Sequence, residues 1–123
     1  MTSNPSVFDK PKTSVLIVDD DKAGEVISVC LEKLGYYTIY YQTGSQALEE
    51  IESGLKYRIA IIDYSLSDIA GNEIVLLSKK MNPDSPVIVT SGYNNINHNG
   101  DLFVQKPFDI KLLEGKIKMF LAG

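Results

Sequence analysis

The sequence predicts an α/β domain built on a doubly wound, five-stranded parallel sheet with helices on both faces. At 123 residues, the chain has the length of one domain. Five short apolar runs recur along it, and runs that are continuous rather than alternating suit strands covered on both faces. Segments with the spacing of amphipathic helices separate most of these runs. Alternation of this kind favours parallel strands joined by right-handed crossovers.

The strands are predicted from the apolar runs. The three strongest runs, rich in β-branched residues, lie at Ser14–Val18, Ile59–Ile62 and Val87–Val89. Two weaker runs lie at Tyr37–Tyr41 and Leu102–Val104. The tyrosine-rich second run has no interleaved basic residues, so packing as an edge strand is favoured over base stacking in a nucleic-acid complex.

The helices are predicted from apolar residues that recur on one stripe. In chain order these segments cover residues 23–34, 47–55, 74–81 and 110–121. Gly35 follows the first segment and predicts its end. Thr43 and Gln46 have the spacing of a capping box before the second, and Asp109 is the expected N-cap of the last.

A helix between the fourth and fifth strands is expected to be short or missing. Residues 91–100 read SGYNNINHNG, and Ile96 is the only aliphatic anchor in this segment. His98, the one histidine of the chain, lies among these asparagines with no second histidine or cysteine nearby. We therefore expect His98 to be exposed to solvent and not to bind a metal.

Composition and charge exclude several classes of function. The chain has 12 basic and 16 acidic residues and a net charge of −4, which argues against a surface that binds the phosphates of nucleic acids. The single cysteine, Cys30, excludes an intramolecular disulfide and a cysteine-based zinc site. It lies on the apolar stripe of the first predicted helix, so a buried, inert thiol is expected.

No segment of the sequence indicates a membrane span or a leader. No apolar run approaches the ~20 residues that cross a bilayer. Residues 1–12 lack the apolar centre of a signal peptide and are predicted to be a flexible lead-in to a domain over residues 13–123. We expect the protein to be cytoplasmic and not to bind membranes.

Charged and hydroxyl side chains stand where the predicted strands end. Asp19, Asp20 and Asp21 follow the first strand and Asp63 the third, while Thr90 and Lys106 follow the fourth and fifth. In an open parallel sheet, ligands bind outside the carboxyl ends of the strands. Two carboxylates about 4 Å apart repel by about 4 kcal/mol at an effective dielectric of 20, so such a cluster needs a proton or a cation.

These residue types predict a site for a phosphoryl group and a hard cation. Mg²⁺ binds one or two carboxylates together with a phosphate and keeps several waters. Lys106 would add a point charge toward phosphate oxygens, and the Thr90 hydroxyl could donate to them or accept from them. A carboxylate can itself attack phosphorus to form an aspartyl phosphate. Asp63 is the expected nucleophile, because it stands alone while the run from Asp19 to Asp21 resembles a set of metal ligands.

Taken together, these motifs resemble the receiver domains of two-component response regulators. The resemblance covers about Val15 to Leu121 and rests on VLIVDDD, IAIIDYSLSDIAG, VIVTSG and LFVQKPF in this order. The intervals from Asp19 to Asp63, to Thr90 and to Lys106 are 44, 27 and 16 residues. The resemblance implies the flavodoxin-like receiver fold, with strand order 2-1-3-4-5.

The resemblance also implies a role for each residue of the site. Asp63 would accept a phosphoryl group from a phosphohistidine of a sensor kinase or phosphotransfer protein. Asp19, Asp20, Asp63 and the main-chain carbonyl of Ser65 would hold Mg²⁺, and Thr90 and Lys106 would contact the phosphoryl oxygens.

The same family resemblance implies a switch and a cis peptide bond. Thr90 and Phe103 would form the switch that reports phosphorylation at the surface, and the Lys106–Pro107 bond would be cis. A downstream protein or a second copy of the chain is a possible further partner, since Leu112 and Met119 lie off the apolar stripe of the last helix.

Three other functions remain open at this point. An aspartyl-phosphate hydrolase of the haloacid-dehalogenase kind would carry a second aspartate two residues after the nucleophile, where this chain has Ser65. A flavodoxin-like cofactor binder would need a phosphate-binding loop after the first strand, where three aspartates would repel a phosphate. A pseudo-receiver would bind partners without being phosphorylated. The leading expectation is a phosphoacceptor module that is not an enzyme in its own right.

Overall fold

Five parallel strands form one sheet in the order β2-β1-β3-β4-β5. The computed structural model describes residues 13–122, so the predicted lead-in over residues 1–12 lies outside the described residues. The predicted fold class and strand order are confirmed. The elements are, in chain order, β1 (Ser14–Val18), α2 (Lys22–Lys33), β2 (Tyr37–Tyr41), α3 (Gly44–Glu52), β3 (Ile59–Asp63), α4 (Gly71–Met81), β4 (Val87–Ser91), β5 (Leu102–Gln105) and α5 (Ile110–Leu121).

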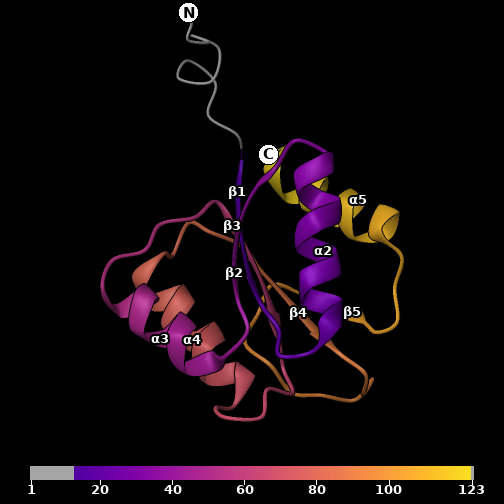
Figure 1. Ribbon diagram of the computed structural model, residues 1–123. Helices are drawn as coiled ribbons and strands as arrows, with labels where there is room; N and C mark the ends of the chain where they lie inside the picture. The colour runs from indigo at the N-terminus through magenta and orange to yellow at the C-terminus, as the bar shows by residue number, and fades with distance from the viewer. Residues whose placement is uncertain (1–12, 123) are drawn as a thin grey trace, which may run out of the picture.

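The helices cover the sheet in two pairs. Figure 1 shows the sheet nearly edge-on, with α3 and α4 on one face and α2 and α5 on the other. Residues of even number in β1 and β3, such as Leu16 and Ile62, pack toward α3 and α4. Residues of odd number, such as Ile17 and Ile61, pack toward α2 and α5. Both faces are therefore buried, as the continuous apolar runs indicated.

Side-chain caps fix where three of the helices begin. Thr43 accepts a hydrogen bond from the Gln46 amide at the start of α3, and Asp109 accepts one from the Leu112 amide at the start of α5, so both predicted caps are confirmed. Asp21 caps α2 in the same way. Each cap satisfies an amide that has no partner within its helix.

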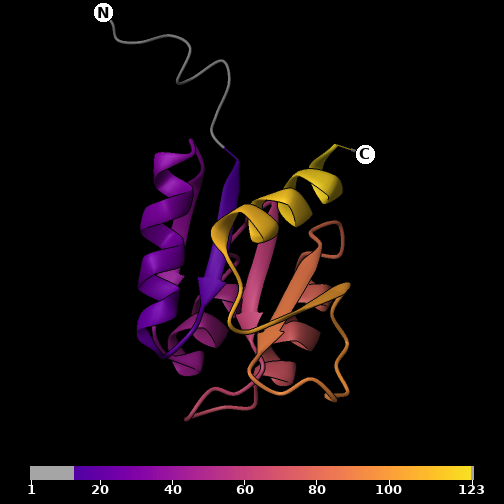
Figure 2. The ribbon, with the colours of Figure 1, turned by 90° about the vertical axis from the view of Figure 1, so that its right-hand side faces the viewer.

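The connection between β4 and β5 contains no helix over residues 92–101, in agreement with the expectation of a short or missing helix between these strands (Figure 2). Side chains attach this loop to α4 instead. Asn72 donates to the Asn99 side chain and accepts from the Asn99 amide, at 2.8 and 2.9 Å. The Asp101 carboxylate accepts from Lys79 at 2.6 Å and from the Val87 amide at 2.7 Å. The alternation of strands and helices along the chain would place a packed helix in this segment. The segment is instead a loop that polar contacts hold in place.

Two residues differ from expectation in their exposure. His98 is half-buried rather than exposed, because its Nδ1 accepts from the Gly100 amide at 3.0 Å and its ring lies 6.0 Å from that of Phe103. Cys30 is also only half-buried and not fully enclosed.

None of the helices in residues 13–122 is long and apolar enough to cross a membrane.

Candidate functional site

The pleat of the sheet carries four polar side chains to one corner of the molecule. Successive residues of a strand point to opposite faces, so a residue shares the face of the one two positions before it. Four strand residues pack toward α2 and α5: Ile17, Ile61, Ile88 and Val104. Two positions after each of them, at the carboxyl ends of β1, β3, β4 and β5, come the four polar side chains: Asp19, Asp63, Thr90 and Lys106.

Lys106 joins the ends of β1 and β3. Its Nζ donates to the Asp19 carboxylate at 2.9 Å and to the Asp63 carboxylate at 3.3 Å. The side chains of Asp19 and Asp63 are only 3% and 5% exposed, and that of Lys106 is 16% exposed. A charge-assisted contact of this kind compensates carboxylates that would be costly to bury alone. This contact joins two residues that lie 87 positions apart in the sequence.

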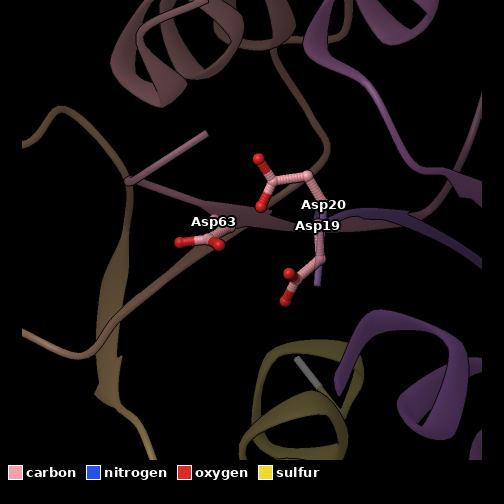
Figure 3. A group of neighbouring side chains, drawn as sticks. All are labelled: Asp19, Asp20 and Asp63. Atoms are coloured by element: carbon pink, nitrogen blue, oxygen red, sulfur yellow. The ribbon is translucent and has the colours of Figure 1, made fainter. Parts of the chain in front are cut away.

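Asp20 completes a cluster of three carboxylates. One oxygen each from Asp19, Asp20 and Asp63 lie within 4.8 Å of one another. Figure 3 shows the three side chains gathered where β1 and β3 end. Asp20 is half-buried, and its Oδ2 accepts from the Ser67 amide at 2.8 Å, so the loop after β3 fixes this carboxylate.

The charges of this cluster are only partly balanced. Three carboxylates share one ammonium group, and burial raises the pKa of Asp19 to about 6 even though the hydrogen bond from Lys106 lowers it. Burial alone would lower the pKa of Lys106, but the hydrogen bond and charge of Asp19 outweigh it and the pKa is raised. Oxygen donors with an excess of negative charge are what a hard divalent cation requires. The residues present therefore fit Mg²⁺.

Comparison with known proteins decides the family. Residues 15–118 match the response regulator receiver domain. The chain belongs to this family. Receiver domains are the phosphoacceptor domains of two-component signalling.

The receiver domain matches curated proteins that are longer than it. A cyclic di-GMP phosphodiesterase of Thermotoga maritima is 29% identical over 112 residues, which cover 85% of this chain and 30% of that protein. The heme response regulator HssR of Staphylococcus saprophyticus is 32% identical over 117 residues, covering 89% of this chain and 51% of that protein. The chain thus spans about half or less of the length of these relatives.

Solved structures of receiver domains have the same fold. A CheY-like receiver domain protein from Methanospirillum hungatei superposes with a TM-score of 0.83 and 29% identity, covering 90% of this chain and 94% of that chain. TrrA of Thermotoga maritima, crystallised in complex with Mg²⁺ and BeF, gives a TM-score of 0.77 and 26% identity, covering 88% and 98% of the two chains.

The other residues singled out in the sequence lie at different distances from the acidic cluster. Thr90 is buried and pairs with Asp63 in the register of β3 and β4. The Ser65 amide donates to Asp63 Oδ1 at 3.0 Å, in the loop after β3. Phe103 is half-buried with the apolar cluster under α3 and α4, on the opposite face of the sheet from Thr90. The Lys106–Pro107 peptide bond is cis.

Sequence reasoning missed the role of Asp68, which lies in the same loop after β3 as Ser67. Its carboxylate accepts from the Gly44 amide at 3.0 Å, the Ser45 amide at 2.9 Å and the Ser45 hydroxyl at 2.7 Å. The acid thus caps the start of α3 from a loop 23 residues away, where the helix dipole favours a negative charge. Hydrogen bonds from Ser45 hold the pKa of Asp68 down at about 2. Between Asp68 and Asp63, the loop also supplies the Ser67 amide that binds Asp20.

Replacing Asp68 by alanine is expected to lower the thermal midpoint of unfolding at neutral pH and to weaken Mg²⁺ binding. The loss frees the loop that positions the Asp20 carboxylate. Because the pKa of Asp68 is depressed in the folded protein, its contribution is present above about pH 4 and disappears as the pH falls toward 2. The deficit of Asp68→Ala should therefore vanish near pH 2. Thermal scans across pH and titration with Mg²⁺ measure both effects, and an unchanged Mg²⁺ affinity would contradict the positioning of Asp20.

An apolar groove opens beside the site. Its volume is about 300 Å³, and Lys106 is one of its lining residues. Val26, on the exposed side of α2, is 60% exposed. The remaining lining residues are Ala23, Ile27, Cys30, Pro107, Phe108 and Ile110. The groove thus offers apolar surface next to Lys106.

Proposed function

We propose that Asp63 accepts a phosphoryl group from a phosphohistidine on a sensor kinase or phosphotransfer protein. An oxygen of the Asp63 carboxylate forms a bond to phosphorus while the bond from phosphorus to the donor imidazole nitrogen breaks. The imidazole leaves with the bonding electron pair and takes up a proton. The observation that carries this proposal is the meeting of Lys106 with Asp19 and Asp63 at one buried corner.

Asp19, Asp20, Asp63 and the carbonyl of Ser65 would hold Mg²⁺ at this corner. The cation would neutralise charge on the phosphoryl oxygens during transfer. Lys106 would supply a second positive charge to these oxygens, and the Thr90 hydroxyl a hydrogen bond. TrrA, the similar receiver crystallised with Mg²⁺ and BeF, supports this assignment.

The response to phosphorylation would pass from Thr90 to Phe103. Thr90 pairs with Val104 in the register of β4 and β5, and Phe103 is its neighbour in the same strand. A shift of Thr90 toward the phosphoryl group would move this pair of strands and change the packing of Phe103 beside the loop over residues 92–101. In this chain that loop, rather than a helix, would carry the change to a partner.

Two apolar surfaces support the proposed partners. The apolar groove supports docking of the phosphodonor protein, since one of its lining residues, Lys106, also contacts Asp19 and Asp63. Leu112 and Met119, 47% and 56% exposed on α5, would be available to a downstream protein or a second copy. We propose a cytoplasmic signalling module that assists its own phosphorylation and is not otherwise an enzyme.

Incubation with Mg²⁺ and acetyl phosphate tests the proposed function. The expected product is a mass gain of one phosphoryl group that is stable to acid and labile to base, because acyl phosphates hydrolyse in base. Asp63→Asn should abolish the gain. Asp84→Asn is the matched control, because Asp84 is an exposed aspartate in the turn before β4, at the other end of the strand. Intact mass spectrometry of the three proteins gives the result.

The same experiment separates the phosphoacceptor from a pseudo-receiver. A protein that binds Mg²⁺ but gains no mass would support the pseudo-receiver and overturn the proposal. A gain that survives in Asp63→Asn would place the acceptor on another residue. Asp63 is buried and its charge is partly balanced by Lys106. This arrangement favours the phosphoacceptor, since a pure interaction module has no need of a buried ion pair.

A further inference from the structure

Lys106 has a third carboxylate partner that differs from the other two. Its Nζ donates to Asp21 at 3.1 Å, between the distances to Asp19 and Asp63. The Asp21 side chain is 56% exposed, whereas those of Asp19 and Asp63 are almost fully buried. The three N–H bonds of the ammonium group are therefore all engaged, and one of the three partners lies at the solvent boundary.

Helix α2 holds Asp21 in place. One oxygen, Oδ1, caps the helix by accepting from the Ala23 amide at 2.6 Å. The other oxygen, Oδ2, faces Lys106. The position of this carboxylate is thus set by the helix, while Lys106 reaches it from the buried acids of the site.

We propose that Asp21 is a positioning residue that competes with the incoming phosphoryl group for Lys106 and so slows phosphorylation of Asp63. This inference rests on the proposed function. For Lys106 to contact a phosphoryl oxygen, one of its N–H bonds must leave a carboxylate. Asp21 is the partner that can be released at least cost, because water replaces Lys106 at an exposed carboxylate but not at the buried Asp19.

The charge of Asp21 acts in the same direction. Phosphodonors and the transferred group are anionic, and a carboxylate on the rim of the site repels them during approach. Removal of this charge frees one N–H bond of Lys106 and lowers the repulsion. Both effects increase the rate of phosphorylation, and both weaken with added salt because Asp21 is exposed.

Two variants separate this role from helix capping. Asp21→Ser removes the contact with Lys106 and keeps a good N-cap, while Asp21→Asn keeps the size of the side chain and an N-cap oxygen but removes the charge. Glu25→Gln is the matched control: it removes an exposed acid from the first turn of the same helix, and within residues 13–122 Glu25 forms no ion pair with Lys106. All three proteins should keep the thermal midpoint of the wild type.

The initial rate of mass gain with acetyl phosphate at saturating Mg²⁺ tests the proposal. We expect a rate about threefold to tenfold above wild type for Asp21→Ser and Asp21→Asn, from the loss of one nearby charge, and a smaller change for Glu25→Gln. The increase should shrink at high salt. In the protein without Mg²⁺, the NMR resonance of the Lys106 ammonium nitrogen should move in the Asp21 variants and stay in place in Glu25→Gln.

Unchanged or lower rates in both Asp21 variants would overturn the competition. An equal increase in Glu25→Gln would reduce the effect to general charge repulsion and would also overturn it. These results are distinct from a failure of the proposed function, which would appear as a wild-type protein that gains no phosphoryl group or as labelling that persists in Asp63→Asn.

Discussion

Replacing Gly71 by alanine is expected to destabilise the protein by about 2–4 kcal/mol, because the new methyl group would meet backbone atoms that have no room to move. Gly71 begins α4 and is buried against the end of β3. An added Cβ would lie 2.7 Å from Tyr64 Cα and 2.8 Å from the Tyr64 carbonyl oxygen, and would also overlap the carbonyl oxygen of Asp63. The clash therefore falls on the backbone of Asp63 and Tyr64.

The expected loss from Gly71→Ala is a large share of the free energy of unfolding, which is about 5–15 kcal/mol for a domain. Urea unfolding measures it. In the folded fraction, labelling by acetyl phosphate should also be slower, since α4 must move away from Asp63.

Gly115→Ala provides the control for this substitution. Gly115 lies within α5, and a Cβ added there meets nothing within 4 Å. Alanine at this site should raise stability by up to about 1 kcal/mol, because glycine is a poor helix former. If both variants unfolded at the same urea concentration, the close contact of Gly71 with Asp63 would have no energetic weight.

The fold and the polar corner could be predicted because each depends on local patterns. A continuous apolar run indicates a strand covered on both faces, and parallel strands bring their carboxyl ends to one edge. Asp19, Asp63 and Lys106 each follow such a run, so their meeting required no knowledge of longer-range packing. The missing helix between β4 and β5 was equally visible in the lack of aliphatic residues around Ile96.

The contacts that surround the site could not be predicted, because they join loops to elements that are distant in sequence. Asp68 caps α3 across 23 residues, and nothing in its own neighbourhood indicates that partner. In the sequence, Asp21 forms one acidic run with Asp19 and Asp20. A closer comparison with the following helix identifies it as a cap, since Asp is favoured immediately before an amphipathic stripe.

The burial of His98 could not be predicted for the same reason. His98 was expected to be exposed because its sequence neighbours are polar, yet the polar loop folds back and places the ring beside Phe103. The pairs formed by Asn72 with Asn99 and by Lys79 with Asp101 hold it there. Polar residues can hold a loop in place as a packed apolar face does, and a pattern of apolar residues carries no information about such contacts.

Without Mg²⁺, stability is expected to fall by about 2–3 kcal/mol as the pH rises from 4 to 6, owing to Asp19. Burial raises the pKa of this carboxyl from 3.8 to about 6. Within this window the folded protein keeps a proton that the unfolded chain has released. Deprotonation of the folded form then costs free energy. Once the pH is above the pKa values of both the unfolded and the folded state, the effect of Asp19 on the free energy of unfolding is constant.

Asp19→Asn should remove most of this decline, because an amide does not titrate. Asp84→Asn, at an exposed turn, should keep it. Chemical unfolding at several pH values measures the slope for each protein, and saturating Mg²⁺ should flatten the slope of the wild type by stabilising the ionised carboxylates. Equal slopes for the wild type and Asp19→Asn would show that the buried acid keeps its ordinary pKa. The excess negative charge that favours a cation would then be carried by the other carboxylates of the cluster.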